Sequence, residues 1–371
     1  MTSPTQAKQP SNQVLNFRRS TIANESQFYS TTVPLSTSQQ DLPPIPVPAF
    51  GFLRGILVHV VASGGAGSAV GTQDSPFNAL SFNFTNSTTQ AAFYGPLPAG
   101  LFAMLSNKYG GYRYGSDPRS GIFTPVQSSG NFEFYTYIPI EILKRSGLGS
   151  ISNLNAAVAY QLQLAISPVS TIYSTAPTTL PSISIDVTSV NWAQPQASNI
   201  LGEATTGTPP DLGAVQFWSL SNSFNVNAGA QTLQLTNLGY YLRNLIFIWF
   251  VGGSRSDSGF PNPFNLYVDG YKWTSLSPDR WRMRMFENFG YNPNPAARDA
   301  VGGQDTGVYV YDFTDDFGLQ SGGELRNAWL PTIPSELIEI DSTFGASGTL
   351  YVLQNSIAVA GNTNPFLHAT L

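Results

Sequence analysis

The most apolar run in the sequence covers residues 240–251, YYLRNLIFIWFV, and glycines bound it at both ends. Its aromatic and β-branched residues are typical of a strand that is buried on both faces. The run is too short to cross a bilayer as a helix. The pattern therefore predicts a central strand of a packed sheet, around which we interpret the rest of the chain.

Further strands are predicted on both sides of this run by short segments rich in apolar residues, several of which alternate with polar ones. In the first half these segments are residues 50–63, 80–84, 90–94, 131–142, 156–166 and 183–192. In the second half they are residues 215–224, 232–236, 264–268, 307–313, 336–342 and 348–360. Strands at this spacing, without amphipathic helices between them, predict β-sandwiches.

One segment, from Ser277 to about Phe289, has instead the pattern of an amphipathic helix. Ser277 is a suitable N-cap, and Trp281, Met285 and Phe289 fall on one face. Arg282 falls near this apolar stripe, so we expect its guanidinium to reach solvent or to meet an acid. The second half of the chain is therefore expected to carry one short helix.

Three short sequence matches connect the two halves, each at an offset of about 190 residues. They pair residues 52–57 with 241–246, 139–143 with 334–338, and 159–162 with 350–353. We interpret them as two copies of one fold in tandem, joined by the linker 193–212. The segment 215–224 is an alternative first strand of the second copy, and that choice leaves the two similar domains intact.

The expected domains are an N-terminal arm at 1–45, a first sandwich at 46–200, and a second sandwich with a C-terminal tail at 201–371. Up to position 40 the sequence contains three basic residues, Lys8, Arg18 and Arg19, and one acid, Glu25. One interpretation of the arm is a disordered tail. The other is an arm that becomes ordered on a neighbouring subunit or a surface, where residues 13–28 would form a short helix.

Composition narrows the possible functions. Charged residues make up 11% of the 371 positions, less than half the usual share of about 25%. A surface so poor in charge suggests that neighbouring molecules cover much of it, although an uncharged extracellular β protein is the alternative. The net charge of −5 argues against general nucleic-acid binding. The N-terminus lacks the apolar core of a signal peptide, so none is expected.

Residues capable of catalysis or metal binding are few. The chain has no cysteine and two histidines, His59 and His368, which nearly excludes thiol nucleophiles and histidine-based metal sites. The acids Asp312, Asp315 and Asp316 are either a solvated loop or ligands for a hard cation between subunits. A carboxylate pair for glycoside hydrolysis depends on separation in space, so the sequence leaves it open. We expect no cofactor and no enzymatic activity.

The order of these elements resembles one known family. Residues 276–281 (LSPDRW), the helix that they begin, and residues 307–309 (GVY) resemble the second half of the major capsid proteins of tectiviruses, which are tailless phages with an internal membrane. Residues 51–58 (GFLRGILV) and 137–140 (YIPI) resemble the first half. The agreement in order and spacing extends from about residue 45 to 360.

This resemblance implies an all-β chain of two tandem jelly rolls, three copies of which form a pseudo-hexameric trimer. Such trimers would tile the icosahedral shell of a bacteriophage virion over its internal membrane. They would contact neighbouring capsomers, vertex or minor capsid proteins and, through Lys8, Arg18 and Arg19 of the arm, neighbours or membrane lipids. No sequence-specific nucleic-acid binding is implied. The alternative function is a trimeric β-sandwich spike or adhesin that binds a receptor or glycan.

Overall fold

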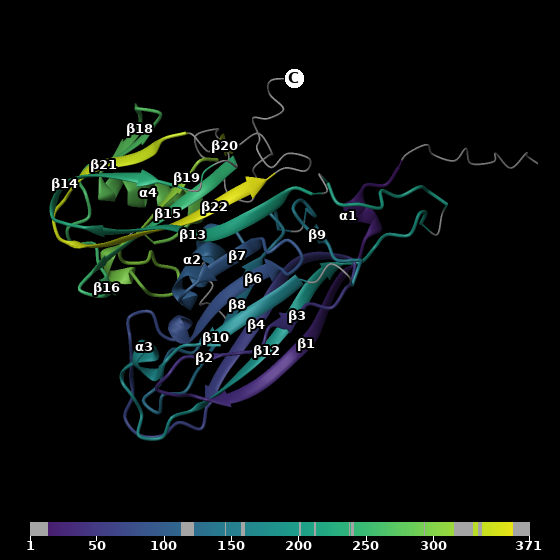
Figure 1. Cartoon of the computed structure of the whole chain (residues 1–371), viewed down its shortest axis with the longest axis horizontal. Coiled ribbons are helices and arrows are strands. Elements are labelled where there is room, and N and C mark those ends of the chain that lie inside the picture. Colours follow the sequence, from purple (N-terminus) through teal and green to yellow (C-terminus); the bar gives the residue numbers. More distant parts are fainter. Residues whose placement is uncertain are drawn as a thin grey trace, which may run out of the picture.

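Two β-sandwiches lie side by side in the computed structural model, one built from the first half of the chain and one from the second (Figure 1). The structure describes residues 14–112, 122–144, 146–156, 160–199, 202–210, 213–236, 238, 241–292, 294–314, 329–332 and 336–358. Over these ranges, no helix is long and apolar enough to span a bilayer.

The first sandwich consists of two antiparallel sheets. One has the order β1 (Ala23–Pro34), β12 (Ser182–Trp192), β4 (Phe52–Ser63) and β8 (Phe132–Pro139), and β9 (Ile151–Ser152) pairs with β4. In the other, β7 (Ala92–Leu97), β6 (Leu80–Asn86) and β10 (Tyr160–Ile166) are neighbours, and β10 also pairs with β2 (Gln40–Asp41) and β3 (Ile45–Pro46). At one end of the sandwich lie β5 (Val70–Gly71), β11 (Tyr173–Thr175), a 3-10 turn (Phe77–Ala79) and the short helix α3 (Val169–Ile172).

The second sandwich repeats this arrangement. Its first sheet has the order β13 (Val215–Val226), β22 (Gly348–Ala358), β15 (Tyr241–Val251) and β19 (Val308–Asp312), and β16 (Ser254–Arg255) and β20 (Leu330–Pro331) also pair with β15. Its second sheet has the order β14 (Gly229–Leu235), β21 (Ile338–Phe344), β17 (Phe264–Val268) and β18 (Tyr271–Leu276). A second 3-10 turn (Pro295–Ala297) precedes β19.

The pairing order identifies both sandwiches as jelly rolls. If β2 and β3 count as one strand and the two- and three-residue strands β5, β9, β11, β16 and β20 are left out, each sandwich pairs its first strand with its last, its last with its third, and its third with its sixth. In the facing sheet the second, seventh, fourth and fifth strands follow one another. This double-sheet topology is that of the jelly roll, so the predicted all-β fold with two tandem jelly rolls is confirmed.

Only one of the three sequence matches joins equivalent strands. Residues 52–57 and 241–246 lie on β4 and β15, the third strands of their sandwiches. The match of 159–162 with 350–353 is wrong, because β10 is a seventh strand and β22 an eighth. The match of 139–143 with 334–338 starts at the end of β8 but ends at the start of β21. Similar alternating strands resemble one another whatever their place in a sheet, and this misled the alignment.

The two strongest sequence predictions are confirmed. The predicted central strand is β15, which has β22 on one side and β19 and β20 on the other, and its residues 242–249 are buried. The predicted helix is α4 (Pro278–Phe289), and the Ser277 side chain accepts a hydrogen bond from the Arg280 N–H at 3.3 Å. Arg282 meets an acid as expected, because it bonds to Asp257.

The structure corrects the prediction that residues 1–45 lie outside the first sandwich. β1 pairs with β12 along almost its whole length, from Ala23 opposite Trp192 to Pro34 opposite Ser182. β1 is an edge strand, and most of its side chains are exposed. Its stability therefore comes from main-chain hydrogen bonds that polar residues provide as well as apolar ones, and no apolar pattern marks it in the sequence.

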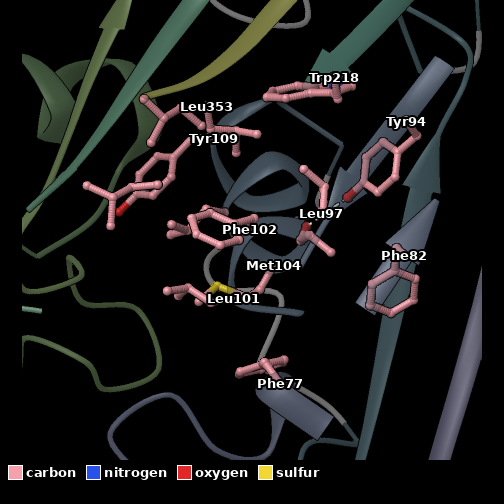
Figure 2. Packing of buried hydrophobic residues seen from close by; sticks show 14 of the residues in the cluster. Phe77, Phe82, Tyr94, Leu97, Leu101, Phe102, Met104, Tyr109, Trp218 and Leu353 are labelled. Carbon is pink, nitrogen blue, oxygen red and sulfur yellow. Dashed lines mark hydrogen bonds between the residues drawn. The ribbon is translucent and has the colours of Figure 1, made fainter. Parts of the chain in front are cut away.

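A helix between the two sandwiches escaped the sequence analysis. α2 (Gly100–Tyr109) is buried over all its residues. Figure 2 shows its side chains Leu101, Phe102 and Met104 between Phe77 and Phe82 of the first sandwich and Trp218 and Leu353 of the second. A helix that is buried on every side has no polar face, so its sequence lacks amphipathic periodicity.

Candidate functional site

The predicted cation ligands are only partly described by the structure. Asp312 ends β19 and is 3% exposed. Its Oδ1 accepts hydrogen bonds from the Thr314 N–H at 3.0 Å and the Thr314 hydroxyl at 2.6 Å. Asp315 and Asp316 lie outside the described residues. The described ranges hold no group of three or more acids and histidines that could bind a metal ion, and Asp312 stabilises the turn after its own strand.

The short helix α1, which follows the first residues of the N-terminal arm, packs against one end of the first jelly roll. α1 (Phe17–Ser20) begins after Asn16, whose side chain accepts from the Arg19 N–H at 3.1 Å. Phe17 is buried, with its ring 5.5 Å from that of Phe52 and 6.4 Å from that of Trp192. The Arg18 guanidinium lies 4.4 Å from the centre of the Trp192 ring. Arg18 and Arg19 are therefore exposed on an anchored helical turn, whereas Lys8 lies outside the described residues.

Exposed apolar side chains surround this attachment point. Ile22 is 75% exposed, and its carbonyl accepts from the Ala193 N–H at 2.8 Å, next to Trp192. Phe50 and Leu154 are also exposed. They flank a hydrogen bond of 2.9 Å between the Asn153 N–H and the Gly51 carbonyl at the start of β4. This end of the molecule therefore combines apolar side chains with the two arginines of α1.

A buried ion pair joins the two jelly rolls. Lys108 of α2 lies 2.7 Å from Asp305 of the second jelly roll, and both side chains are fully buried. The Lys108 ammonium also donates to the Gly303 carbonyl at 2.9 Å, and the Tyr109 hydroxyl donates to Asp305 at 2.8 Å. Burial, and then the negative charge of Asp305, raise the pKa of Tyr109 well above its ordinary value. All of these contacts connect α2 with the second jelly roll. We call this region, where the two jelly rolls meet, the joint.

A second ion-pair network crosses the joint at β16. Arg255 contacts Asp74 of the first jelly roll with Nε at 2.7 Å and Nη2 at 2.6 Å, and it reaches Asp299 of its own jelly roll at 2.9 Å. The main chain of Arg255 also exchanges two hydrogen bonds with the Gln73 side chain. Burial raises the pKa of Asp74, and the positive charge of Arg255 opposes that rise.

The two jelly rolls also share a sheet. β13 pairs in parallel with β7 through Trp218 and Tyr94, which makes an eleven-stranded sheet continuous across the joint. Beside it, the Gln216 amide donates to the Glu141 carbonyl at 3.0 Å and accepts from the Tyr112 hydroxyl at 2.6 Å. The joint is therefore held by main-chain pairing, buried charges and apolar packing together.

These joint residues were missed by the sequence analysis for a physical reason. Lys108 and Asp305 are 197 positions apart, and each is a single charge among uncharged residues. No spacing rule links such a pair. The one available signal is a lysine close behind the apolar stretch of residues 100–105, because a lysine that such a stretch carries into the interior needs an acidic partner.

Among the comparisons with known proteins, the structural one supports the fold, whereas the sequence comparisons found no match. No protein-family model and no curated protein matches the sequence significantly. The major capsid protein of Sulfolobus turreted icosahedral virus is similar in structure, with a TM-score of 0.60 and 16% identity over 94% of this chain and 100% of that chain. VP54 of the virus PBCV-1, fitted into a reconstruction of the virophage Sputnik, has a TM-score of 0.53 and 10% identity over 91% and 93% of the two chains. The chain therefore has the double jelly-roll fold of these capsid proteins.

Proposed function

We propose that this chain is the major capsid protein of an icosahedral virion, and that its function is structural rather than catalytic. The observation that carries the proposal is the pair of jelly rolls with the same strand order, held in one body by a shared sheet. Three such chains around a threefold axis place six similar sandwiches in a ring. A ring of that outline tiles a hexagonal lattice, and a closed trimer satisfies ordinary cyclic symmetry.

The sparse charge of the chain supports assembly. With 11% charged residues, the outer walls of the sandwiches present few charged groups, so burying them against neighbouring capsomers costs less desolvation than burying a charge-rich surface would. A spike or adhesin of the same fold would occupy few sites and would not form a lattice. Lattice formation therefore distinguishes the proposed function from this alternative.

The end of the molecule that carries α1, which we call the arm end, suggests which side of the subunit faces the inside of the shell. Arg18 and Arg19 are exposed beside Ile22, Phe50 and Leu154. Basic and apolar side chains together suit an anionic lipid surface, at about 1 kcal/mol for each basic residue near the headgroups. We therefore place this end toward an internal membrane, as in a tailless bacteriophage, or toward the neighbouring subunits and minor proteins that line the inside of the shell.

The first test of the proposed function is the mass of the purified protein in solution. Light scattering is expected to give three times the 40.0 kDa of one chain, and the value should not change on dilution. Electron microscopy of concentrated samples is then expected to show closed shells or hexagonal sheets. A monomer that forms no lattice would leave the fold intact and contradict the proposed coat function.

Two truncations separate the arm from the fold. Removal of residues 1–13 is expected to leave a folded trimer with an unchanged melting temperature but to reduce shell formation, which electron microscopy measures. Removal of residues 1–40 deletes β1, which is the strand that pairs with β12 at the edge of the sheet. The first jelly roll is therefore expected to unfold. Normal shells from the shorter truncation would contradict a role of the arm in assembly, and a folded product of the longer one would contradict the importance of β1.

A further inference from the structure

A cleft lies where the two jelly rolls meet, at the end of the molecule away from the arm. Its volume is about 400 Å³. The first jelly roll contributes residues near β5, α2 and α3, and the second contributes residues of β15, β16 and β22. In Figure 1, α3 and β16 lie far from α1 along the longest axis. If the arm end faces inward, as proposed above, the cleft opens toward the outside of the shell.

One side of the cleft is aromatic. The Tyr351 ring lies between two phenylalanine rings, with centres 5.6 Å from Phe102 at 64° and 5.4 Å from Phe250 at 83°. All three residues line the cleft and come from both jelly rolls. Edge-to-face contacts of this kind hold the rings in fixed orientations. The cleft therefore offers a rigid apolar surface on which a flat, uncharged ring can pack.

Polar side chains also line the cleft. The Oδ1 of Asn78 is buried without accessible surface, so a ligand in the cleft would meet the Nδ2 donor of this amide. Both contacts of Arg255 with Asp74 reach Oδ1 of that carboxylate, so Oδ2 remains for another donor. Hydroxyls of Ser170 and Ser254 at the rim add groups that both donate and accept.

These two sides define the chemistry of the ligand. It needs a ring with an apolar C–H face for the aromatic side and several hydroxyls, which can donate to Asp74 and accept from Asn78. It should be uncharged, because Arg255 already compensates Asp74 and an anion would approach a carboxylate. Volumes of 300–1,000 Å³ with a few convergent polar groups are typical of small-ligand sites. We propose that the cleft binds a neutral sugar residue of a cell-surface glycan, which would make it a host-attachment site of the shell.

Two variants and a matched control test ligand binding by the cleft, and all three are chosen to leave the fold of the protein intact. Asn78→Leu removes the Nδ2 donor, and with it the buried unpartnered Oδ1, at nearly constant volume, so it is expected to leave the melting temperature unchanged or higher and to weaken glycan binding about tenfold or more. Ser170→Trp places a large side chain at the exposed rim and is expected to abolish binding. Thr175→Trp, exposed at the same end but not lining the cleft, is the matched control and should bind as the parent protein does.

The experiment measures binding of the full-length protein to an array of neutral and sialylated glycans, followed by saturation-transfer NMR with the methyl glycosides of glucose, galactose, mannose and N-acetylglucosamine. Saturable binding of a neutral sugar that Ser170→Trp removes would support the proposal. It would be overturned if no neutral glycan binds, if Ser170→Trp binds normally, or if Ser170→Trp lowers the solution mass, since the cleft would then be a contact between copies. Solution mass and glycan binding are measured on the same sample, so failure of the coat proposal is distinguished from failure of this one.

Discussion

The Lys108→Met variant is expected to unfold with a free energy about 3–5 kcal/mol below that of the parent protein. Lys108 and Asp305 are fully buried and 2.7 Å apart, so the substitution leaves a carboxylate in an apolar interior without its cation. The Tyr109 hydroxyl donates to the same carboxylate but carries no charge to balance it. Urea denaturation followed by circular dichroism measures the change.

The location of this pair predicts more than a loss of stability. Because it joins the two jelly rolls, its removal is expected to broaden the unfolding transition as the two units begin to unfold separately. The double variant Lys108→Met/Asp305→Leu should recover part of the loss, since replacing both charges by apolar groups removes the desolvation cost. Lys272→Met, at an exposed position on β18, should change stability by no more than about 0.5 kcal/mol. If Lys108→Met matched that control, the ion pair would have no role in holding the joint.

The second large effect is expected at the core of the second jelly roll. Trp281 of α4 is 1% exposed, and its Nε1–H donates to the Val310 carbonyl at 2.6 Å. Its ring lies 5.1 Å from that of Phe264 and 5.7 Å from that of Phe247. Trp281→Ala removes these contacts and leaves a cavity under the helix, so a loss of about 3–5 kcal/mol is expected in chemical denaturation.

A matched control lies on the same helix. Met283 is 48% exposed on the opposite face of α4, so Met283→Ala should change the stability by no more than about 0.5 kcal/mol. Equal melting temperatures for Trp281→Ala and the parent protein would mean that α4 does not anchor the core. A large effect of Met283→Ala instead would mean that the exposed face of α4 packs against another subunit.

Two kinds of element could be predicted from the sequence. One kind has a buried face and an exposed face, and the other is a strand that is buried along its whole length. α4 has one buried face that contains Trp281 and Met285, so its periodicity is strong. β15 is buried along most of its length and stands out as an apolar run. β18 was missed although Asp269 and Gly270, both with positive φ, form a two-residue hairpin turn before it. Asp-Gly between two strands favours this turn, so here the signal was present and was overlooked.

Other elements left little trace in the sequence. β1 is polar because it lies at an edge with most side chains in solvent, and α2 has no solvent-facing polar stripe because both jelly rolls cover it. The joint is harder still to predict, since Arg255 and Asp74 are 181 positions apart and meet only after both jelly rolls have formed. Local patterns report the environment of neighbouring residues, whereas contacts between domains depend on how complete domains pack.

The sheet that runs through both jelly rolls has a mechanical consequence for a shell. Between the parts of the two jelly rolls that the structure describes, the parallel pairing at Trp218 and Tyr94 and the packing of α2 resist bending. Each capsomer would then behave as a stiff plate. A closed shell made of stiff plates must take up its curvature at their rims, so shells of different radius would be built by changing the angle between trimers while each subunit keeps its shape.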